Sequence, residues 1–308
     1  TELRSEYQSN PLALDVAQPR LSWVLEAEGR GQKQAAYQVL VATTETALLH
    51  GRGDAWDSGM VENSANFHIV YGGKRLESGR RYWWKVRVRD GAGQVSKWSA
   101  TAYWQMGLLD SEGWKGQWIG PRETTASPML RKAFTVSGPV RRATAHVVGL
   151  GWYELQLNGV KAGDMVLAPV NSDYKRVLYY DTCDVTAQLR QGANNVGVWL
   201  GNGYNENYSK WGYRHGGPLR ALVQLNIEYA DGHTASVVSD GSWEWSASPI
   251  TANDIYNGES YDARLEAQAK FNLGNCAYAD ALDKQGDLKE AMAKLKVAIS
   301  HYKDAIAA

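Results

Sequence analysis

The sequence has little cysteine and few motifs of enzyme chemistry. Its 308 residues include two cysteines, Cys183 and Cys276, in segments that look unrelated, and six histidines without metal-ligand spacing. These residues predict neither a disulfide framework nor a metal site built on paired cysteines, and they do not indicate a compartment. A phosphate-binding loop and a nucleophile motif are also missing from the sequence.

Charge and hydropathy exclude two classes of partner. The chain carries 33 basic and 33 acidic side chains, so its formal net charge is zero. The one-sign field that attracts nucleic acid or an anionic membrane is therefore not expected. No apolar run approaches the roughly twenty residues of a membrane span, and the first residues form no basic-then-apolar leader. We expect a soluble chain, without its signal peptide, that binds neutral partners.

Tryptophan and tyrosine, in contrast, are abundant. There are 13 Trp and 17 Tyr against only 3 Phe. Trp and Tyr combine a flat apolar face with a polar edge, which suits sugars, whereas Phe offers the face alone. Most of these rings are expected in protein cores, because large aromatic side chains are mostly buried. A few exposed rings would be enough to bind a sugar.

The length predicts more than one hydrophobic core. Residues 1–107 contain short strand-like segments, of which residues 81–90 alternate between apolar and basic side chains. This alternation is typical of a strand with one core face and one solvated face, so we predict a small antiparallel sandwich over 1–107. Residues 108–129 show few signs of regular structure and are predicted to be a connector.

A second, larger sandwich is predicted over residues 130–264. Its strand-like segments are separated by turn residues such as Asp231-Gly232 and Asp240-Gly241. Roughly eight strands are expected, which is the number of a jelly roll. Strands broken by Asn, Gly, Asp and Tyr turns are typical of lectin-like modules, and we expect sugar-facing loops between them.

The composition changes at residue 265. Residues 265–308 contain eleven Ala, two Gly, no Pro and no Trp. Apolar residues recur at steps of three and four from Leu288 to Tyr302, which predicts an amphipathic helix. A second helical stretch is predicted over 267–284, with Asp287 as N-cap of the following helix. The two would form a helical hairpin.

Many short motifs resemble, in order, the noncatalytic N-terminal modules of bacterial α-L-rhamnosidases, glycoside hydrolase family 78. In the first sandwich they are PRLSW (19–23), WDSG (56–59), Tyr82 with WKV (84–86), and SKWS (96–99). In the second they are LRK (130–132), GLG (149–151), LNG (157–159), LAP (167–169), DVT (184–186), GNG (201–203) and IYNGESYDAR (255–264). The tail resembles one tetratricopeptide unit, with an insertion around 279–283.

The resemblance implies a fibronectin-III or immunoglobulin-like first domain and a jelly-roll second domain. In that family the second type of domain includes calcium-dependent L-rhamnose-binding modules, and the resemblance favours an extracellular or periplasmic location. The enzymes of the family place their catalytic carboxylates in a large toroid domain after these modules, and this chain stops before it. We therefore expect sugar binding without hydrolysis by this chain.

Two loops are the candidate sugar site. In the loop after Pro169, Asn171, Asp173 and Tyr174 would bind the sugar, with Asn171 and Asp173 also holding Ca²⁺, because calcium prefers oxygen ligands that sugar hydroxyls can complete. An ordinary Asx turn is the alternative for this loop. The second loop, 201–213, would contribute four further sugar-binding residues, and Asn202 among them would also be a calcium ligand. The four are Asn202, Tyr204, Asn205 and Trp211.

The second loop has its own alternative, which is a loop folded on its own aromatic rings. A third group consists of Asp254, Glu259 and Asp262. A glycosidase needs two carboxylates held at a defined separation across the glycosidic bond, and closeness in sequence does not provide that geometry. We therefore favour a structural role for these residues. Two further functions stay open for the whole chain. The first alternative is a scaffold that binds a protein through the C-terminal helices, and the second is a fragment of a rhamnoside hydrolase. The junction near Leu265 fits a natural or an engineered fusion.

Overall fold

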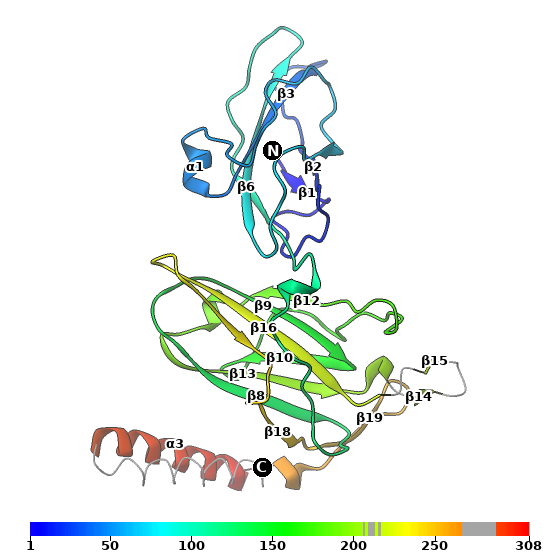
Figure 1. Ribbon diagram of the computed structural model, residues 1–308, viewed down its shortest axis with the longest axis vertical. Coiled ribbons are helices and arrows are strands. Elements are labelled where there is room, and N and C mark those ends of the chain that lie inside the picture. Colours follow the sequence, from blue (N-terminus) through cyan, green and yellow to red (C-terminus); the bar gives the residue numbers. More distant parts are fainter. Residues whose placement is uncertain (206, 209–212, 215–216, 267–287, 308) are drawn as a thin grey trace. The chain divides into compact units, whose positions relative to one another are not determined.

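The computed structural model describes residues 1–205, 207–208, 213–214, 217–266 and 288–307 (Figure 1). It divides into two compact units, Thr1–Lys115 and Gly116–Ala308. Each unit has a separate hydrophobic core. The predicted mainly-β class, with β-sandwich domains, is confirmed. The predicted domain boundaries at 107, 129 and 264 stay predictions.

The first unit contains two antiparallel sheets and one short helix, α1 (Glu45–Leu49). The smaller sheet has the order β1 (Arg4–Ser5), β2 (Arg20–Ser22), β5 (Ile69–Val70). The larger sheet has the order β4 (Trp56–Asp57), β3 (Gln34–Ala42), β6 (Arg81–Asp90), β7 (Ala102–Gln105). Aromatic rings fill the space between them, as in the stacked pair of Tyr82 and Trp104, whose centroids are 5.8 Å apart.

Strand β6 confirms the predicted alternation, but its second face is not simply solvated. Tyr82, Trp84 and Val86 are buried, as expected. Lys85 on the opposite face is also buried, because α1 and Trp98 cover it. Its Nζ donates a hydrogen bond to the carbonyl of Leu48, 2.7 Å away, at the end of α1. The expectation of a fully solvated face is therefore wrong at Lys85.

The second unit is a sandwich of a five-stranded and a four-stranded sheet (Figure 1). The first has the order β11 (Val160–Lys161), β10 (Trp152–Leu157), β13 (Gly192–Gly201), β8 (Pro128–Val136), β18 (Glu244–Ala247). The second has the order β12 (Asp181–Asp184), β9 (Val140–Leu150), β16 (Arg220–Tyr229), β17 (Thr234–Val238). All these pairs are antiparallel.

Alternation along the strands decides which side chains enter this core. In β13, Val196, Val198 and Leu200 are buried, whereas Asn195, Gly197 and Trp199 lie between them and face outward. Two small hairpins complete the strands, β14 (Asn207–Tyr208) with β15 (Tyr213–Arg214), and β19 (Ile250–Asp254) with β20 (Gly258–Tyr261). Three 3-10 helices, η1 (Ser111–Gly113), η2 (Thr186–Gln188) and η3 (Gly203–Asn205), lie in connections.

The predicted connector and tail differ in how much of them the structure describes. The connector pairs with the second sandwich, because Ile119 and Ala221 exchange two backbone hydrogen bonds of 2.9 Å. Helix α3 (Leu288–Ala307) confirms the predicted last helix. The predicted helix 267–284 and the cap Asp287 lie outside the described residues, so the tetratricopeptide-like hairpin stays a prediction. Within the described ranges, no helix is long and apolar enough to cross a membrane.

Candidate functional site

The first predicted loop leaves the sandwich beside the start of β10. The amide of Tyr153 donates to the carbonyl of Ala168, 2.9 Å away, and so ties the loop to the strand. The next peptide bond, Ala168–Pro169, is cis. The bridge between Tyr153 and Ala168 places the start of this loop at the end of the sandwich where β10 begins.

Asp173 organises the turn that follows. Its Oδ1 accepts from the amide of Lys175 at 3.1 Å, and its carbonyl accepts from the amides of Arg176 and Val177 at 2.8 and 2.9 Å. Arg176 Nε also lies 3.5 Å from Asp173 Oδ2. The Asx-turn alternative is therefore present, yet the Asp173 side chain is 51% exposed, and Asn171 is exposed as well. Both can still meet a ligand from solvent.

The second loop uses its asparagine side chains to hold its own shape. The backbone N–H of Asn202 donates to Asn253 Oδ1 at 2.7 Å, and the side-chain Nδ2 of Asn202 donates to the backbone carbonyl of Asn253 at 3.0 Å. Asn205 is buried, and its Nδ2 donates to the carbonyl of Gly217 at 2.9 Å. Asn202 is partly exposed, whereas Asn205 has little surface to offer a sugar.

Aromatic rings from the two loops meet at the start of β10. Tyr204 packs edge-on against Trp152, with 5.6 Å between ring centroids. The close approach requires Gly203, because a Cβ there would lie 2.6 Å from Trp152 Cγ. Burial raises the pKa of the Tyr174 phenol, a hydrogen bond with the backbone of Gly151 opposes this rise, and the nearby Tyr204 adds to it. The Tyr174 phenol therefore lies next to Gly151, the residue before Trp152, at the end of β10 that Tyr204 also contacts.

The predicted site residues thus fall into three groups. Tyr174 and Tyr204 lie at the start of β10, beside Gly151 and Trp152, and Asn171 and Asp173 lie on the loop that carries Tyr174. Asn202 and Asn205 belong to the same end but mainly support their loop. Trp211 lies outside the described residues. In the part of the chain that the structure describes, no three His, Cys, Asp or Glu side chains gather as a metal site.

Two of the three acidic residues in 254–262, Asp254 and Asp262, have structural partners. Asp254 Oδ1 accepts from the amides of Tyr256 and Asn257, at 2.6 and 2.8 Å, within the turn that joins β19 to β20. Arg264 Nη2 donates to Asp262 Oδ2 at 2.8 Å, and this hydrogen bond lowers the pKa of the Asp262 carboxyl group. These contacts agree with the structural role that the sequence favoured.

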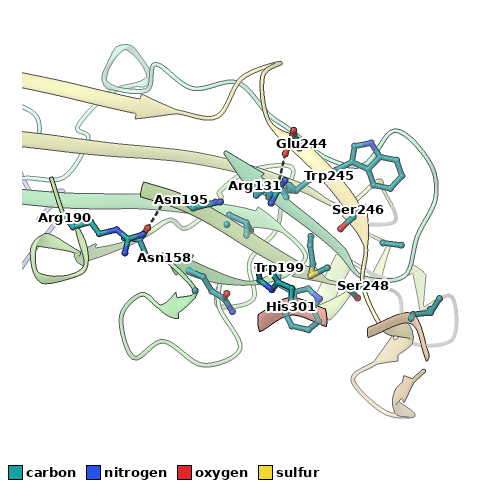
Figure 2. Close-up of a pocket in the computed structure, with 18 residues that line it drawn as sticks. Arg131, Asn158, Arg190, Asn195, Trp199, Glu244, Trp245, Ser246, Ser248 and His301 are labelled. Atoms are coloured by element: carbon teal, nitrogen blue, oxygen red, sulfur yellow. Dashed lines mark hydrogen bonds and ion pairs between the residues drawn. The ribbon is translucent and has the colours of Figure 1, made fainter. Parts of the chain in front are cut away.

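A groove on the outward face of the five-stranded sheet was not predicted from the sequence (Figure 2). Its volume is about 1100 Å³, and its lining includes Arg131, Asn195, Trp199, Glu244 and Ser246. Trp199 was expected among the core aromatics, because large rings are usually buried. The available signal was the alternation of β13, which places Asn195, Gly197 and Trp199 on the outward face.

Comparison with known proteins finds relatives of one kind. Residues 138–297 match the family model of the α-L-rhamnosidase N-terminal domain, and residues 1–110 match that of the Rha78A-like N-terminal immunoglobulin domain. An α-L-rhamnosidase of Formosa agariphila is 34% identical over 96% of this chain. An α-L-rhamnosidase of Alteromonas sp. is 33% identical over 84% of it.

Solved structures agree with the sequence relatives. The α-L-rhamnosidase from Dictyoglumus thermophilum has a TM-score of 0.79 and 37% identity, covering 86% of this chain and 31% of its own. The enzyme from Aspergillus terreus has a TM-score of 0.76 and 28% identity, with the same two coverages. This chain spans 35% of the Formosa relative and 30% of the Alteromonas relative. The chain belongs to the family of α-L-rhamnosidase N-terminal domains.

Proposed function

We propose that the second unit is a noncatalytic carbohydrate-binding domain that holds a terminal L-rhamnose or a similar neutral sugar. The observation that carries the proposal is the packing of Tyr204 against Trp152 at the start of β10, where Tyr174 of the other predicted loop reaches the backbone of Gly151. L-rhamnose is the sugar of choice because the relatives are α-L-rhamnosidases. Hydrolysis is not part of the proposal, since Asp254 is engaged in a turn and Asp262 in an ion pair with Arg264.

The chemistry of the cluster suits a deoxy sugar. The methyl group and C–H face of L-rhamnose would pack on the partly exposed Tyr204 ring. Its hydroxyl groups would bond to the exposed oxygens of Asn171 and Asp173. Asn202 and Asn205 would act as positioning residues, because their hydrogen bonds to Asn253 and Gly217 hold the loop that carries Tyr204.

Calcium is a further part of the proposal. Asn171 and Asp173 would hold the ion, because both offer exposed oxygen atoms of the kind that calcium prefers. Asn202 would contribute only its amide oxygen, since its Nδ2 donates to Asn253. Arg176 would have to move away, because it faces the Asp173 carboxylate at 3.5 Å. A bound ion would supply fixed positive charge to vicinal sugar hydroxyls.

Calorimetric titration of L-rhamnose tests the proposal, with calcium and then with a chelator. We expect saturable heat for the unmodified protein and at least about tenfold weaker binding for Tyr204→Ala. Tyr256→Ala is the matched control, because Tyr256 is an exposed tyrosine of another turn in the same unit. If Tyr204→Ala binds L-rhamnose as tightly as the unmodified protein, the sugar site is not at Tyr204. If the chelator does not change the affinity for L-rhamnose, only the calcium part of the proposal is wrong.

One observation favours a second function, protein interaction through α3. Met292, Leu295 and Ile299 share one face of the helix and are 51%, 37% and 52% exposed. Exposed apolar faces commonly mark contact surfaces. Light scattering should then show concentration-dependent association that Met292→Lys with Ile299→Lys abolishes and that Lys303→Glu, on the same helix, retains. A monomer at every concentration would count against self-association.

A further inference from the structure

The outward face of the five-stranded sheet has the build of an extended binding groove. Strand registers place residues of its floor in two rows that cross the strands. The rows are Ser246, Met129, Trp199, and Glu244, Arg131, Gly197, Gln156. His301 of α3 also lines the groove, and the enclosed volume of about 1100 Å³ has room for more than one sugar ring.

Gly197 is the most informative residue of the groove. It lies inside β13, and its backbone is not in the left-handed region that favours glycine. A Cβ at this position would meet only the carbonyl of Leu130, at an ordinary 3.5 Å. By contrast, a Cβ at Gly151 would lie 2.4 Å from the carbonyl of Gly201. Packing therefore demands glycine at 151 but not at 197.

Glycine inside a strand weakens it and often marks a place where another molecule approaches the backbone closely. Because neither conformation nor packing requires Gly197, we assign its role to the groove. The missing side chain leaves the floor open beside Trp199, which is the next outward residue of the same strand. Both residues line the groove.

Trp199 is held in place before any ligand arrives. Its Nε1 donates to Ser127 Oγ at 2.7 Å, and that hydroxyl donates to the carbonyl of Leu200 at 2.7 Å. A ring fixed in this way loses little conformational entropy when it stacks on a ligand. Sugars stack on such rings through their C–H faces, while their hydroxyls need nearby polar partners.

Polar groups flank the ring; Arg131 and Glu244 offset each other's charge, and Arg190, whose Nε donates to the carbonyl of Ala193 at 3.1 Å, adds a positive charge. Arg131 Nε donates to Glu244 Oε2 at 2.9 Å, and these side chains are 53% and 68% exposed (Figure 2). Gln156 Nε2 donates to Glu154 Oε1 at 2.8 Å in the neighbouring strand. Donors and acceptors in compensated pairs suit hydroxyl groups better than a charged ligand.

We propose that this groove binds an internal stretch of a neutral glycan chain, at a site separate from the loop cluster of Tyr174 and Tyr204. The proposal goes beyond the terminal-sugar function and does not require it. Its occupant is a run of neutral pyranose rings, because Trp199 offers a ring for stacking and the charges of Arg131 and Glu244 beside it offset each other.

The test uses surface plasmon resonance with immobilised linear neutral oligosaccharides of galactose, xylose or glucose, which carry no terminal rhamnose. Gly197→Val should fill the groove without destabilising β13, because β-branched residues favour strands. We expect at least one oligosaccharide to bind the unmodified protein and Gly197→Val to weaken that binding at least about tenfold. Gly197→Ala, which adds one methyl group, should weaken oligosaccharide binding to a smaller extent. If Gly197→Val unfolds at a lower temperature than the unmodified protein, the binding of Gly197→Ala tests the proposal instead.

Tyr204→Ala separates the two sites. It should abolish binding of free L-rhamnose and leave binding of the oligosaccharide unchanged, whereas Gly197→Val should do the reverse. Failure of L-rhamnose to bind would therefore overturn only the loop site. The groove proposal is overturned if no oligosaccharide binds, or if the chain binds equally well with valine at position 197.

Discussion

At the residue scale, Asp173 shows that a turn and a ligand site can use the same carboxylate. One oxygen accepts the Lys175 amide, and the other faces Arg176 at 3.5 Å. The Arg176 side chain is 84% exposed, so this ion pair contributes little to stability. It does, however, compete with any cation that approaches Asp173.

Removal of Arg176 should therefore favour calcium. We expect Arg176→Ala to bind calcium more tightly than the unmodified protein, by several-fold, and to keep the same midpoint of urea unfolding. Calorimetric titration of calcium measures the first effect. Arg264→Ala, which removes another exposed partner of an aspartate, is the control and should leave calcium binding unchanged. A weaker calcium affinity in Arg176→Ala would place the ion elsewhere.

A second residue, His146, should make stability depend on pH. It is fully buried in β9, with Nδ1 2.8 Å from Thr182 Oγ1, and burial lowers its pKa from 6.5 to about 4. The unfolded chain therefore binds a proton at this residue at a higher pH than the folded chain does. Stability from neutral His146 is complete above pH 6.5 and is lost as the pH falls toward 4.

The full loss corresponds to roughly 3 kcal/mol. Urea unfolding at a series of pH values between 7 and 4.5 would measure it, and His146→Gln should flatten the curve over that range. Carboxyl groups with a lowered pKa, such as Asp240 beside Lys132, titrate below this range. An unchanged slope in His146→Gln would contradict the assignment.

At the scale of elements, alternation along the sequence predicts strands well but not what covers their second face. Residues 81–90 and 192–201 are strands, with the expected side chains in the cores. Lys85 is buried only because α1, from a distant part of the sequence, packs over it. Trp199 faces a groove because neighbouring strands place Arg131 and Gln156 beside its row. Such cross-strand neighbours cannot be read from one segment.

The candidate site shows the same limit. Its two loops were predicted from their Asn, Asp and Tyr residues, and Tyr174 and Tyr204 reach adjacent residues, Gly151 and Trp152, at the start of β10. The sequence did not predict that Asn202 would be paired with Asn253, because these residues are about fifty positions apart. Side chains that suit a ligand also suit a loop, so only the fold separates the two roles.

The turn between β10 and β11 offers a test of element geometry. Gly159 has a φ of +79°, whereas Gly241 does not lie in the left-handed region, and a Cβ would meet nothing within 4 Å at either position. Gly159→Ala should therefore cost about 1 kcal/mol through backbone strain, and Gly241→Ala should be neutral or slightly stabilising. Urea unfolding measures both, and equal effects would contradict the difference in backbone conformation.

At the scale of the whole molecule, the described residues of each unit form a main core of their own, and the first unit adds a smaller cluster around Leu40 and Leu48. Trp104 is fully buried in the first core, so Trp104→Ala should cost about 3–5 kcal/mol there. Hydrogen exchange followed by mass spectrometry should show faster exchange in residues 1–115 and unchanged exchange in 116–266. Faster exchange throughout the chain would show that the two cores unfold as one.

The most direct test of the sugar-binding account is a crystal structure of the protein with L-rhamnose and calcium. The account predicts the sugar at the end of the second unit, with its methyl or C–H face on Tyr204 and its hydroxyl groups near Asp173. Electron density for the sugar at another surface, or an empty cluster at a saturating concentration of L-rhamnose, would contradict it.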